Sequence, residues 1–234
     1  MTALRSIPIS PPPAKGSFAL RQLLTASGLT LALLVGGCSS NAPWKKQAFA
    51  LATPSGGTGP VAHTNILSLR RVTVSPLYGG KALVYRTGDN SYERDPYAEF
   101  LVPPNQMMDE CLRMCLRDGH AFGAVLEPDS GLNSSCFMEA SVSQLYGDFR
   151  QPGKPLAVLQ IRFELYMTTP ADDGRMVWQR ELSKRLPLAH RTAAALVAGW
   201  SAGLQEIMDE VNTELKHVEI PEVLPLSTGI RNEE

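Results

Sequence analysis

Polar and apolar residues alternate along two stretches in the C-terminal half of the chain. They cover residues 136–143 and 157–167, and a turn sequence at 171–174 leads from the second into a third expected strand at 175–186. A period of two is typical of β-strands with one buried face and one solvated face. We expect these strands to pair as an antiparallel meander, which is the simplest arrangement for consecutive strands.

Two other stretches have the helical period. A helix is predicted to open at Pro103-Pro104, because proline suits the first turn, and to end at Gly119. A longer helix is predicted from about Thr192 to His217. Its apolar positions lie on one stripe, and they are Val197, Trp200, Leu204, Ile207, Met208, Val211 and Leu215. We expect this stripe to cover the sheet, the alternative being a partner helix.

Shorter strands are expected at 66–75, which ends before Pro76, and at 81–87 and 91–94, on either side of a Gly-Asp-Asn turn. Together these elements predict an α+β fold, in which an antiparallel or mixed β-sheet packs against two main helices in a single domain, 66–218. The tail at 219–234 is expected to be loose.

The N-terminus has the layout of a secretory signal. Residues 1–22 carry three basic residues and no acidic one, and residues 23–37 carry no charge. This apolar run is shorter than the roughly 20 residues that a spanning helix needs. The sequence therefore predicts a signal peptide at 1–37 that is removed.

The end of this signal, Val35-Gly36-Gly37-Cys38, resembles the lipobox of bacterial lipoproteins. In such a box the cysteine thiol takes up a diacylglycerol, small residues admit the signal peptidase, and the freed amine is acylated, for instance with palmitate. We therefore expect lipidation at Cys38, and two or more acyl chains hold a protein stably on a membrane. The alternatives are an ordinary signal peptide with a chance cysteine, or an uncleaved anchor.

Residues 38–65 are rich in Pro, Gly, Ser and Thr, which predicts a flexible tether, lipidated at its start, with a candidate edge strand at 47–52.

Beyond residue 37 the chain has 19 Lys and Arg against 23 Asp and Glu. This acidic balance argues against nucleic acid as a partner, since nucleic-acid binding needs a basic face.

The usual catalytic and metal-binding patterns are missing from the sequence. The four histidines, at 63, 120, 190 and 217, have no ligand partner at a metal spacing, and there is no G-x-S-x-G. We therefore expect a protein that is not an enzyme and that has no metal or cofactor besides its covalent lipid.

Three cysteines fall on predicted buried faces: Cys111 and Cys115 on the first helix, and Cys136 on a strand. The Cβ atoms of residues four apart on a helix are ~5–6 Å apart, whereas a disulfide prefers ~3.8 Å. A bridge between the two helical cysteines is therefore discounted. Either one of them bonds Cys136, in an oxidising compartment, or all three are small core residues.

Four of the six tyrosines fall between residues 78 and 97, interleaved with charged residues. Tyrosine and arginine are enriched at protein interfaces. The candidate interface residues are Tyr85, Arg86, Tyr92, Glu93 and Tyr97. The alternative is that these tyrosines brace two short strands against the core.

Several blocks of the chain, in this order, resemble the ABC-type transport auxiliary lipoprotein family, the paraquat-inducible-type lipoprotein partners of MCE (mammalian cell entry) lipid transporters. The blocks are LVYRTG at 83–88 with YE at 92–93 and DPY at 95–97, FLVPP at 100–104, LYGDFR at 145–150, AVLQIRF at 157–163 and VAGW at 197–200.

The resemblance implies a non-enzymatic component of a lipid transport system. The ABC permease and ATPase would supply ATP hydrolysis, and the MCE-domain protein would form a conduit across the periplasm. This chain would anchor or receive that conduit at the periplasmic face of the outer membrane, alone or as a homo-oligomer. Ser39 after the lipobox cysteine favours the outer over the inner membrane, by resemblance to enteric lipoproteins. The alternatives are a structural lipoprotein of another outer-membrane assembly and a cell-envelope hydrolase.

Overall fold

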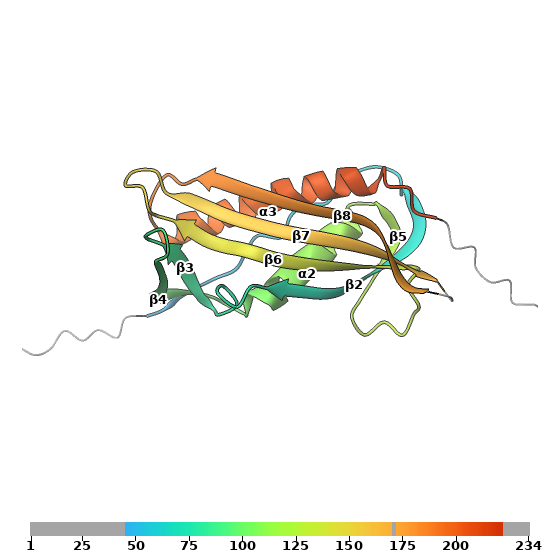
Figure 1. Cartoon of the computed structure of the whole chain (residues 1–234), viewed down its shortest axis with the longest axis horizontal. Helices are drawn as coiled ribbons and strands as arrows, with labels where there is room; N and C mark the ends of the chain where they lie inside the picture. Colours follow the sequence, from blue (N-terminus) through green and yellow to red (C-terminus); the bar gives the residue numbers. More distant parts are fainter. Residues whose placement is uncertain (1–44, 170–171, 222–234) are drawn as a thin grey trace, which may run out of the picture. The chain divides into compact units, whose positions relative to one another are not determined.

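The computed structural model describes residues 45–169 and 172–221, and Figure 1 shows their elements. The predicted signal peptide at 1–37, the predicted lipidation site Cys38 and the part of the predicted tail from 222 onward lie outside the described residues. In chain order the elements are β1 (Gln47–Phe49), β2 (His63–Val74), β3 (Ala82–Arg86), β4 (Tyr92–Phe100), α2 (Pro104–Asp118), β5 (Phe122–Leu126), β6 (Cys136–Asp148), β7 (Leu156–Thr169), β8 (Asp172–Pro187) and α3 (Ala193–Leu215).

The strands form one mixed sheet, as the α+β prediction requires. Strands β6, β7 and β8 pair in sequence as an antiparallel meander, which confirms that prediction for these three. Strands β3 and β4 also pair antiparallel, as a hairpin. The other pairs differ: β2 lies parallel to both β5 and β6, β3 is parallel to β6, and β1 is parallel to β4. Parallel pairing needs a long crossover, and the segment from β3 to α2 supplies one between β2 and β5.

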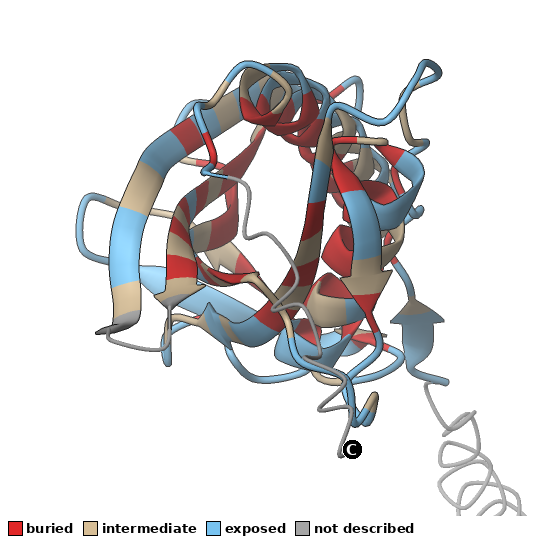
Figure 2. Cartoon of the chain, turned by 90° about the vertical axis from the view of Figure 1, so that its right-hand side faces the viewer, coloured by how far each residue is buried: buried red, intermediate tan, exposed pale blue. Residues whose placement is uncertain are grey.

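Both helices cover the same, apolar side of the sheet. Helix α3 packs on β7 and β8, while α2 packs on β2 and β5. Figure 2 shows the buried positions on the inner side of the curved sheet and on the helices. At the centre Trp200 is 1 % exposed, and its Nε1 donates to the carbonyl oxygen of Val158 at 3.1 Å. The prediction that the last helix covers the sheet is therefore confirmed.

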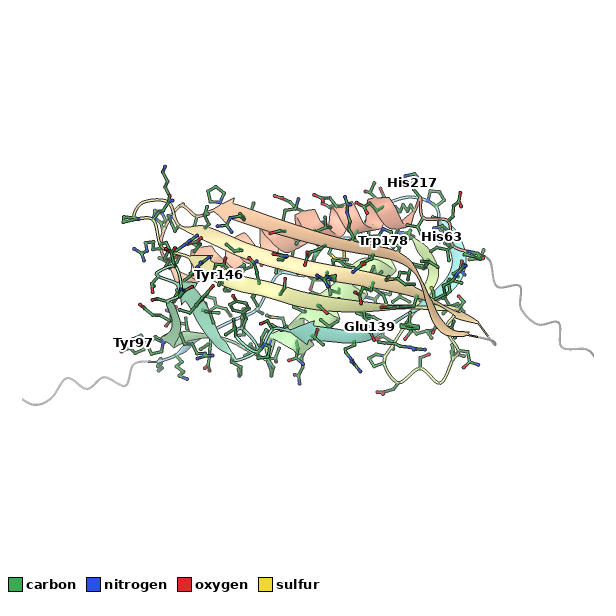
Figure 3. The ribbon with its side chains drawn as sticks, viewed as in Figure 1. His63, Tyr97, Glu139, Tyr146, Trp178 and His217 are labelled. Atoms are coloured by element: carbon green, nitrogen blue, oxygen red, sulfur yellow. The ribbon has the colours of Figure 1, made fainter. Side chains whose placement is uncertain are left out.

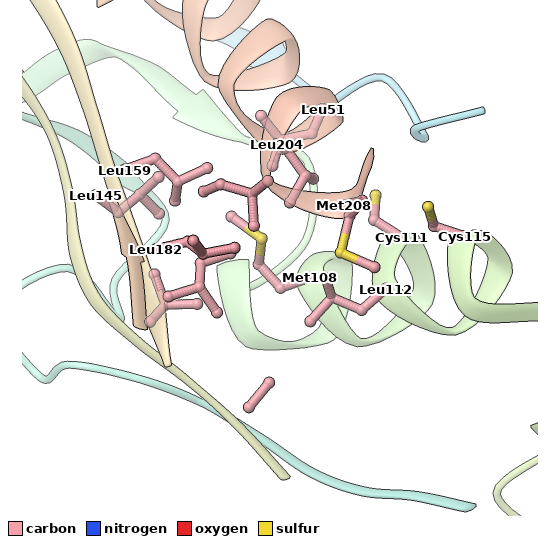
Figure 4. Close-up of a cluster of buried hydrophobic side chains, with 14 of the residues drawn as sticks. Leu51, Met108, Cys111, Leu112, Cys115, Leu145, Leu159, Leu182, Leu204 and Met208 are labelled. Carbon is pink, nitrogen blue, oxygen red and sulfur yellow. The ribbon is translucent and has the colours of Figure 1, made fainter. Parts of the chain in front are cut away.

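Residues 50–62, which we call the N-terminal strap, differ from the predicted tether. Leu51 and Pro54 are buried, and Figure 4 shows Leu51 in the same cluster as Leu204 of α3. The backbone N–H of Ala52 donates to Ser201 Oγ at 3.0 Å, and the strap ends on β2. The edge strand predicted at 47–52 is present as the three residues of β1.

Neither helix in the described part of the chain is both long enough and apolar enough to cross a membrane.

Candidate interaction surface at the β3–β4 hairpin

The turn of the β3–β4 hairpin is held by the side chain of Arg86. Its Nε donates to the carbonyl oxygen of Gly88 at 3.3 Å and its Nη2 to that of Asp89 at 2.6 Å. The guanidinium also lies 5.8 Å from the ring centroid of Tyr92, within the range of a cation–π contact. Arg86, a candidate interface residue, thus stabilises the turn of the hairpin.

Tyr85, another candidate, is directed into the domain. Its hydroxyl donates to Asp95 Oδ2 at 2.6 Å, and its ring stacks on Phe149 with centroids 4.8 Å apart. Burial, and then the hydrogen bond to the Asp95 carboxylate, raise the pKa of Tyr85. This residue braces the hairpin, as the alternative reading of the tyrosines proposed.

A bulge in β4 separates the two halves of this strand. Val84 pairs with Arg94, yet Ala82 pairs with Glu99, so β4 contains extra residues here. Asp95 Oδ1 closes the bulge by accepting the backbone N–H groups of Tyr97, at 2.7 Å, and Ala98, at 2.9 Å. Tyr97 is 50 % exposed, and Figure 3 labels it at the end of the sheet where β3 and β4 lie.

Tyr92, on the other half of β4, belongs to a cluster of three tyrosines with Tyr78 and with Tyr146 of β6. Tyr78 and Tyr146 stack with centroids 5.7 Å apart, and Tyr92 meets Tyr146 edge-on at 5.8 Å. Tyr78 is buried, and burial raises its pKa. Tyr92 is 42 % exposed, and the neighbouring Glu93 is also exposed. The candidate interface therefore reduces to Tyr92, Glu93 and Tyr97.

The hairpin is fastened to the sheet by a charged cluster around Asp148, at the end of β6. This carboxylate is 5 % exposed and accepts from Arg150 at 2.8 Å and from Arg185 of β8 at 2.9 Å. Arg150 also reaches Asp89 in the hairpin turn, at 3.1 Å. The hydrogen bonds from Arg150 dominate over burial and lower the pKa of Asp148 to about 2.

Pattern reading from the sequence did not single out Asp148, Phe149 or Arg150. The available signal was the LYGDFR block at 145–150, which belongs to the family resemblance. Tyr146 of the same block completes the tyrosine cluster, so this block supplies partners for the hairpin across the sheet.

The three cysteines of the described residues are free and buried. Burial raises the pKa of Cys111, that of Cys115 to about 11 and that of Cys136 to about 12. The Cys115 thiol lies 3.5 Å from Asn212 Nδ2 on α3, whereas the Cys136 thiol faces the carbonyl oxygen of Ile66. The structure thus has the cysteines as small core residues, without a bridge.

Within residues 45–169 and 172–221, no group of three or more His, Cys, Asp or Glu side chains is arranged to hold a metal ion. His63 instead makes a hydrogen bond with the carbonyl oxygen of Leu215 at 2.8 Å, and His120 makes one with that of Gly57 at 3.1 Å. His63 thus links β2 to the end of α3, and His120, which follows α2, links the end of that helix to the strap.

The sequence of this domain matches one protein family, described as the ABC-type transport auxiliary lipoprotein component, over residues 49–212. The match runs from the end of β1 to the last turn of α3 and so covers every element between them. The chain belongs to this family. The resemblance drawn from the sequence blocks is thereby confirmed. Among curated proteins, no sequence matches this auxiliary lipoprotein.

Solved structures share the fold of the auxiliary lipoprotein. Protein XCC0632 from Xanthomonas campestris, a DUF330 protein, aligns with a TM-score of 0.61 at 16% identity, over 72% of this chain and 95% of its own. An uncharacterized protein aligns with a TM-score of 0.59 at 17% identity, over 73% of this chain and 99% of its own. At such identities the likeness shows the fold alone.

Proposed function

We propose that this auxiliary lipoprotein is a non-enzymatic component of an MCE-type ABC lipid transport system. It anchors or receives the periplasmic MCE conduit at the outer membrane, to which a lipid on Cys38 holds it. The observation that carries the proposal is the family match over 49–212, because it spans almost the whole described domain. The lipobox at 35–38 supports the membrane anchor.

The division of labour follows from the same proposal. The permease and ATPase of the transporter hydrolyse ATP, the MCE-domain protein forms the conduit, and this protein needs no cofactor besides its lipid. The exposed pair of Tyr92 and Glu93, which the β4 bulge separates from Tyr97, offers what a protein contact uses, namely aromatic area with a polar tip beside a charge. The partner there is the MCE protein or a second copy of this chain.

The anchor is tested by fatty-acid labelling in cells. Cys38→Ala should abolish incorporation of a clickable fatty acid and release the protein from the membrane fraction. Cys111→Ala is the matched control. The Cys111 thiol is buried in the core, so this substitution should leave labelling intact. Undiminished labelling of the Cys38 variant would exclude lipidation at this residue.

The contact surface is tested by crosslinking in cells. Tyr92→Ser combined with Glu93→Lys should weaken crosslinks to the MCE protein or between copies, with circular dichroism and melting temperature nearly unchanged. The control pair, Leu132→Ser with Asp129→Lys, likewise replaces a large exposed side chain by serine and a carboxylate by lysine, in the loop after β5, and should crosslink fully.

Two results would count against this surface. If the Tyr92 and Glu93 variant unfolds, the segment is structural, because the Tyr92 ring packs on Tyr78 and Tyr146. If it folds and crosslinks as well as the control, the interface lies elsewhere. Co-purification of the wild type with an assembly that lacks MCE, permease and ATPase subunits would favour the structural-lipoprotein alternative.

A further inference from the structure

We propose that a small apolar surface beside the N-terminal end of the described chain lies on the lipid bilayer, so that the domain itself contacts the membrane that its anchor enters. This anchor-side patch consists of Tyr97, Leu101 and Val102, with Lys45 and Lys46 beside it. The inference rests on the proposed lipidation of Cys38.

The pairing of β1 with β4 places the patch next to the incoming chain. Strand β1 runs parallel to β4 with Gln47 opposite Ala98, so the residues just before Gln47 lead past Tyr97. At the other end of β1, the N–H of Leu101 donates to the carbonyl oxygen of Phe49 at 2.8 Å. The patch therefore flanks the strand that continues from the anchor.

The length of chain between the anchor and the patch is short. Seven peptide links separate Cys38 from Lys45. Even a fully extended chain spans no more than ~3.6 Å per residue, so Lys45 lies within about 25 Å of the lipidated cysteine. The domain cannot move far from the bilayer, and the end of the sheet that carries β1 and β4 is the end held close to it.

The side chains of the patch suit a lipid interface. Tyr97, Leu101 and Val102 are 50 %, 60 % and 38 % exposed, whereas Ala98 and Phe100 between them are buried in the core. Tyrosine is enriched where a membrane meets water, because its ring is apolar and its hydroxyl is polar. Moving apolar side chains of this exposure from water into a bilayer is favourable, because it removes apolar surface from water.

The charges beside the patch fit the same occupant. Glu99 lies between Tyr97 and Leu101 in the sequence, and its carboxylate is paired with Lys46 at 3.0 Å. Lys45 is exposed as well. Lysine can lay its aliphatic stem along an apolar surface and keep its ammonium among lipid headgroups, where anionic lipid attracts it. The patch thus presents apolar area with basic residues at its border.

The test compares two probe positions in the full-length lipidated protein. Leu101→Cys and Leu132→Cys each add one thiol at an exposed leucine, in the patch and in the loop after β5, while the native thiols of the domain are buried. Each variant is labelled with an environment-sensitive fluorophore and reconstituted alone into vesicles of phosphatidylethanolamine and phosphatidylglycerol. Headgroup-nitroxide lipids in the vesicles act as the quencher.

We expect a blue shift and strong quenching of the probe at position 101, and neither effect at position 132. Adding Tyr97→Ser and Val102→Ser to the Leu101→Cys variant should reduce both effects, because it removes the apolar neighbours of the probe. The lipid on Cys38 is verified by mass spectrometry in every sample, so a failed anchor is distinguished from a failed patch.

Equal spectra and equal quenching at 101 and 132 on lipidated, vesicle-bound protein would overturn the inference and leave the proposed anchor intact. A probe at 101 that changes only when the MCE protein is added would also overturn it, because the occupant would then be a protein. Absence of lipid on Cys38 would count against the proposed function instead.

Discussion

The side chain of Arg150 connects three parts of the chain. One guanidinium contacts the buried carboxylate of Asp148 at 2.8 Å and the exposed carboxylate of Asp89 at 3.1 Å, and Arg185 of β8 adds a second cation to Asp148. The hairpin turn, the end of β6 and the edge strand β8 are therefore tied by charge-assisted hydrogen bonds. A buried carboxylate with two cations is sensitive to the loss of its charge.

We predict that Asp148→Asn lowers the free energy of unfolding by about 1–2 kcal/mol, because the two arginines lose the carboxylate that they contact. The loss stays this small because both arginines are partly exposed to solvent. Asp89→Asn is the matched control: its side chain is 90 % exposed, so the effect should be much smaller. Urea denaturation of both variants measures the difference. An equal effect of the two substitutions would contradict the assigned role of Asp148.

The same carboxylate gives a pH dependence with a definite sign. Its pKa falls from the ordinary 3.8 to about 2 in the folded protein, mainly through the hydrogen bonds from Arg150. Between these values the unfolded chain binds more protons, so stability contributed by Asp148 is fully present above pH ~4 and is lost as the pH falls towards ~2. Wild-type protein should therefore lose more stability than Asp148→Asn over this range.

At the scale of elements, α3 sits close to the sheet because it has glycine at the contact. A Cβ on Gly199 would lie 2.7 Å from both Ala157 Cβ of β7 and Leu188 Cδ2. One turn later, a Cβ on Gly203 would lie at an ordinary 3.4 Å from Lys184 Cβ. The two glycines share a helix, yet only the first is required by packing.

This contrast predicts opposite effects of the same substitution. Gly203→Ala should stabilise the protein by about 1 kcal/mol, the gain in helix propensity. Gly199→Ala should lower the free energy of unfolding by about 1 kcal/mol overall, because overpacking costs ~1–3 kcal/mol and outweighs the gain in helix propensity. Thermal and urea unfolding measure both variants. A stabilising Gly199→Ala would mean that α3 can shift away from β7.

The elements that the sequence predicted well are those with one buried and one wet face. Strands β6 and β7 alternate because helices cover a single side of the sheet, and β8 follows from the turn sequence after β7. Strand β5 was missed, because its sequence FGAVL has no period of two: Gly123 and Ala124 are both exposed, with Phe122 and Leu126 buried on either side. The second half of β4 was missed because Asp95-Pro96 suggests a loop, although Asp95 closes a bulge there.

Non-local contacts account for the rest. The strap reads as a linker because it contains glycine, but a Cβ on Gly56 would lie 2.3 Å from the backbone of Asp118, so this glycine permits a close approach to α2. Five candidate interface residues were named from the sequence, but the Tyr85 ring points into the domain and Arg86 holds the hairpin turn. Tyr85 has Asp95 and Phe149 as its partners, and the fold brings them together, so the local sequence pattern does not reveal these contacts.

At the scale of the whole molecule, one hydrophobic core joins α2, α3, the strap and the sheet. Leu51, Cys111, Cys136 and Met208 all belong to it. A single core of this kind unfolds cooperatively in most small domains. The cysteines on α2 and β6 therefore report on the same event from two different elements.

We predict that the three core thiols of the described residues react together. In native buffer a thiol reagent should modify none of them, because burial raises the pKa of each thiol and blocks access. Across a urea gradient, mass spectrometry should show protein with no label or with three, and little with one or two. Early labelling at α2 alone would show that this helix opens separately, and two missing labels without reductant would reveal a disulfide.

The strap also sets an order in time. Ala52 and Ser55 make their hydrogen bonds with Ser201 and Gln205, which lie about 150 positions later in the chain. A chain that is delivered from its N-terminus cannot complete these bonds until α3 has arrived. The described residues nearest to the predicted lipidation site are thus among the first to emerge and among the last to settle.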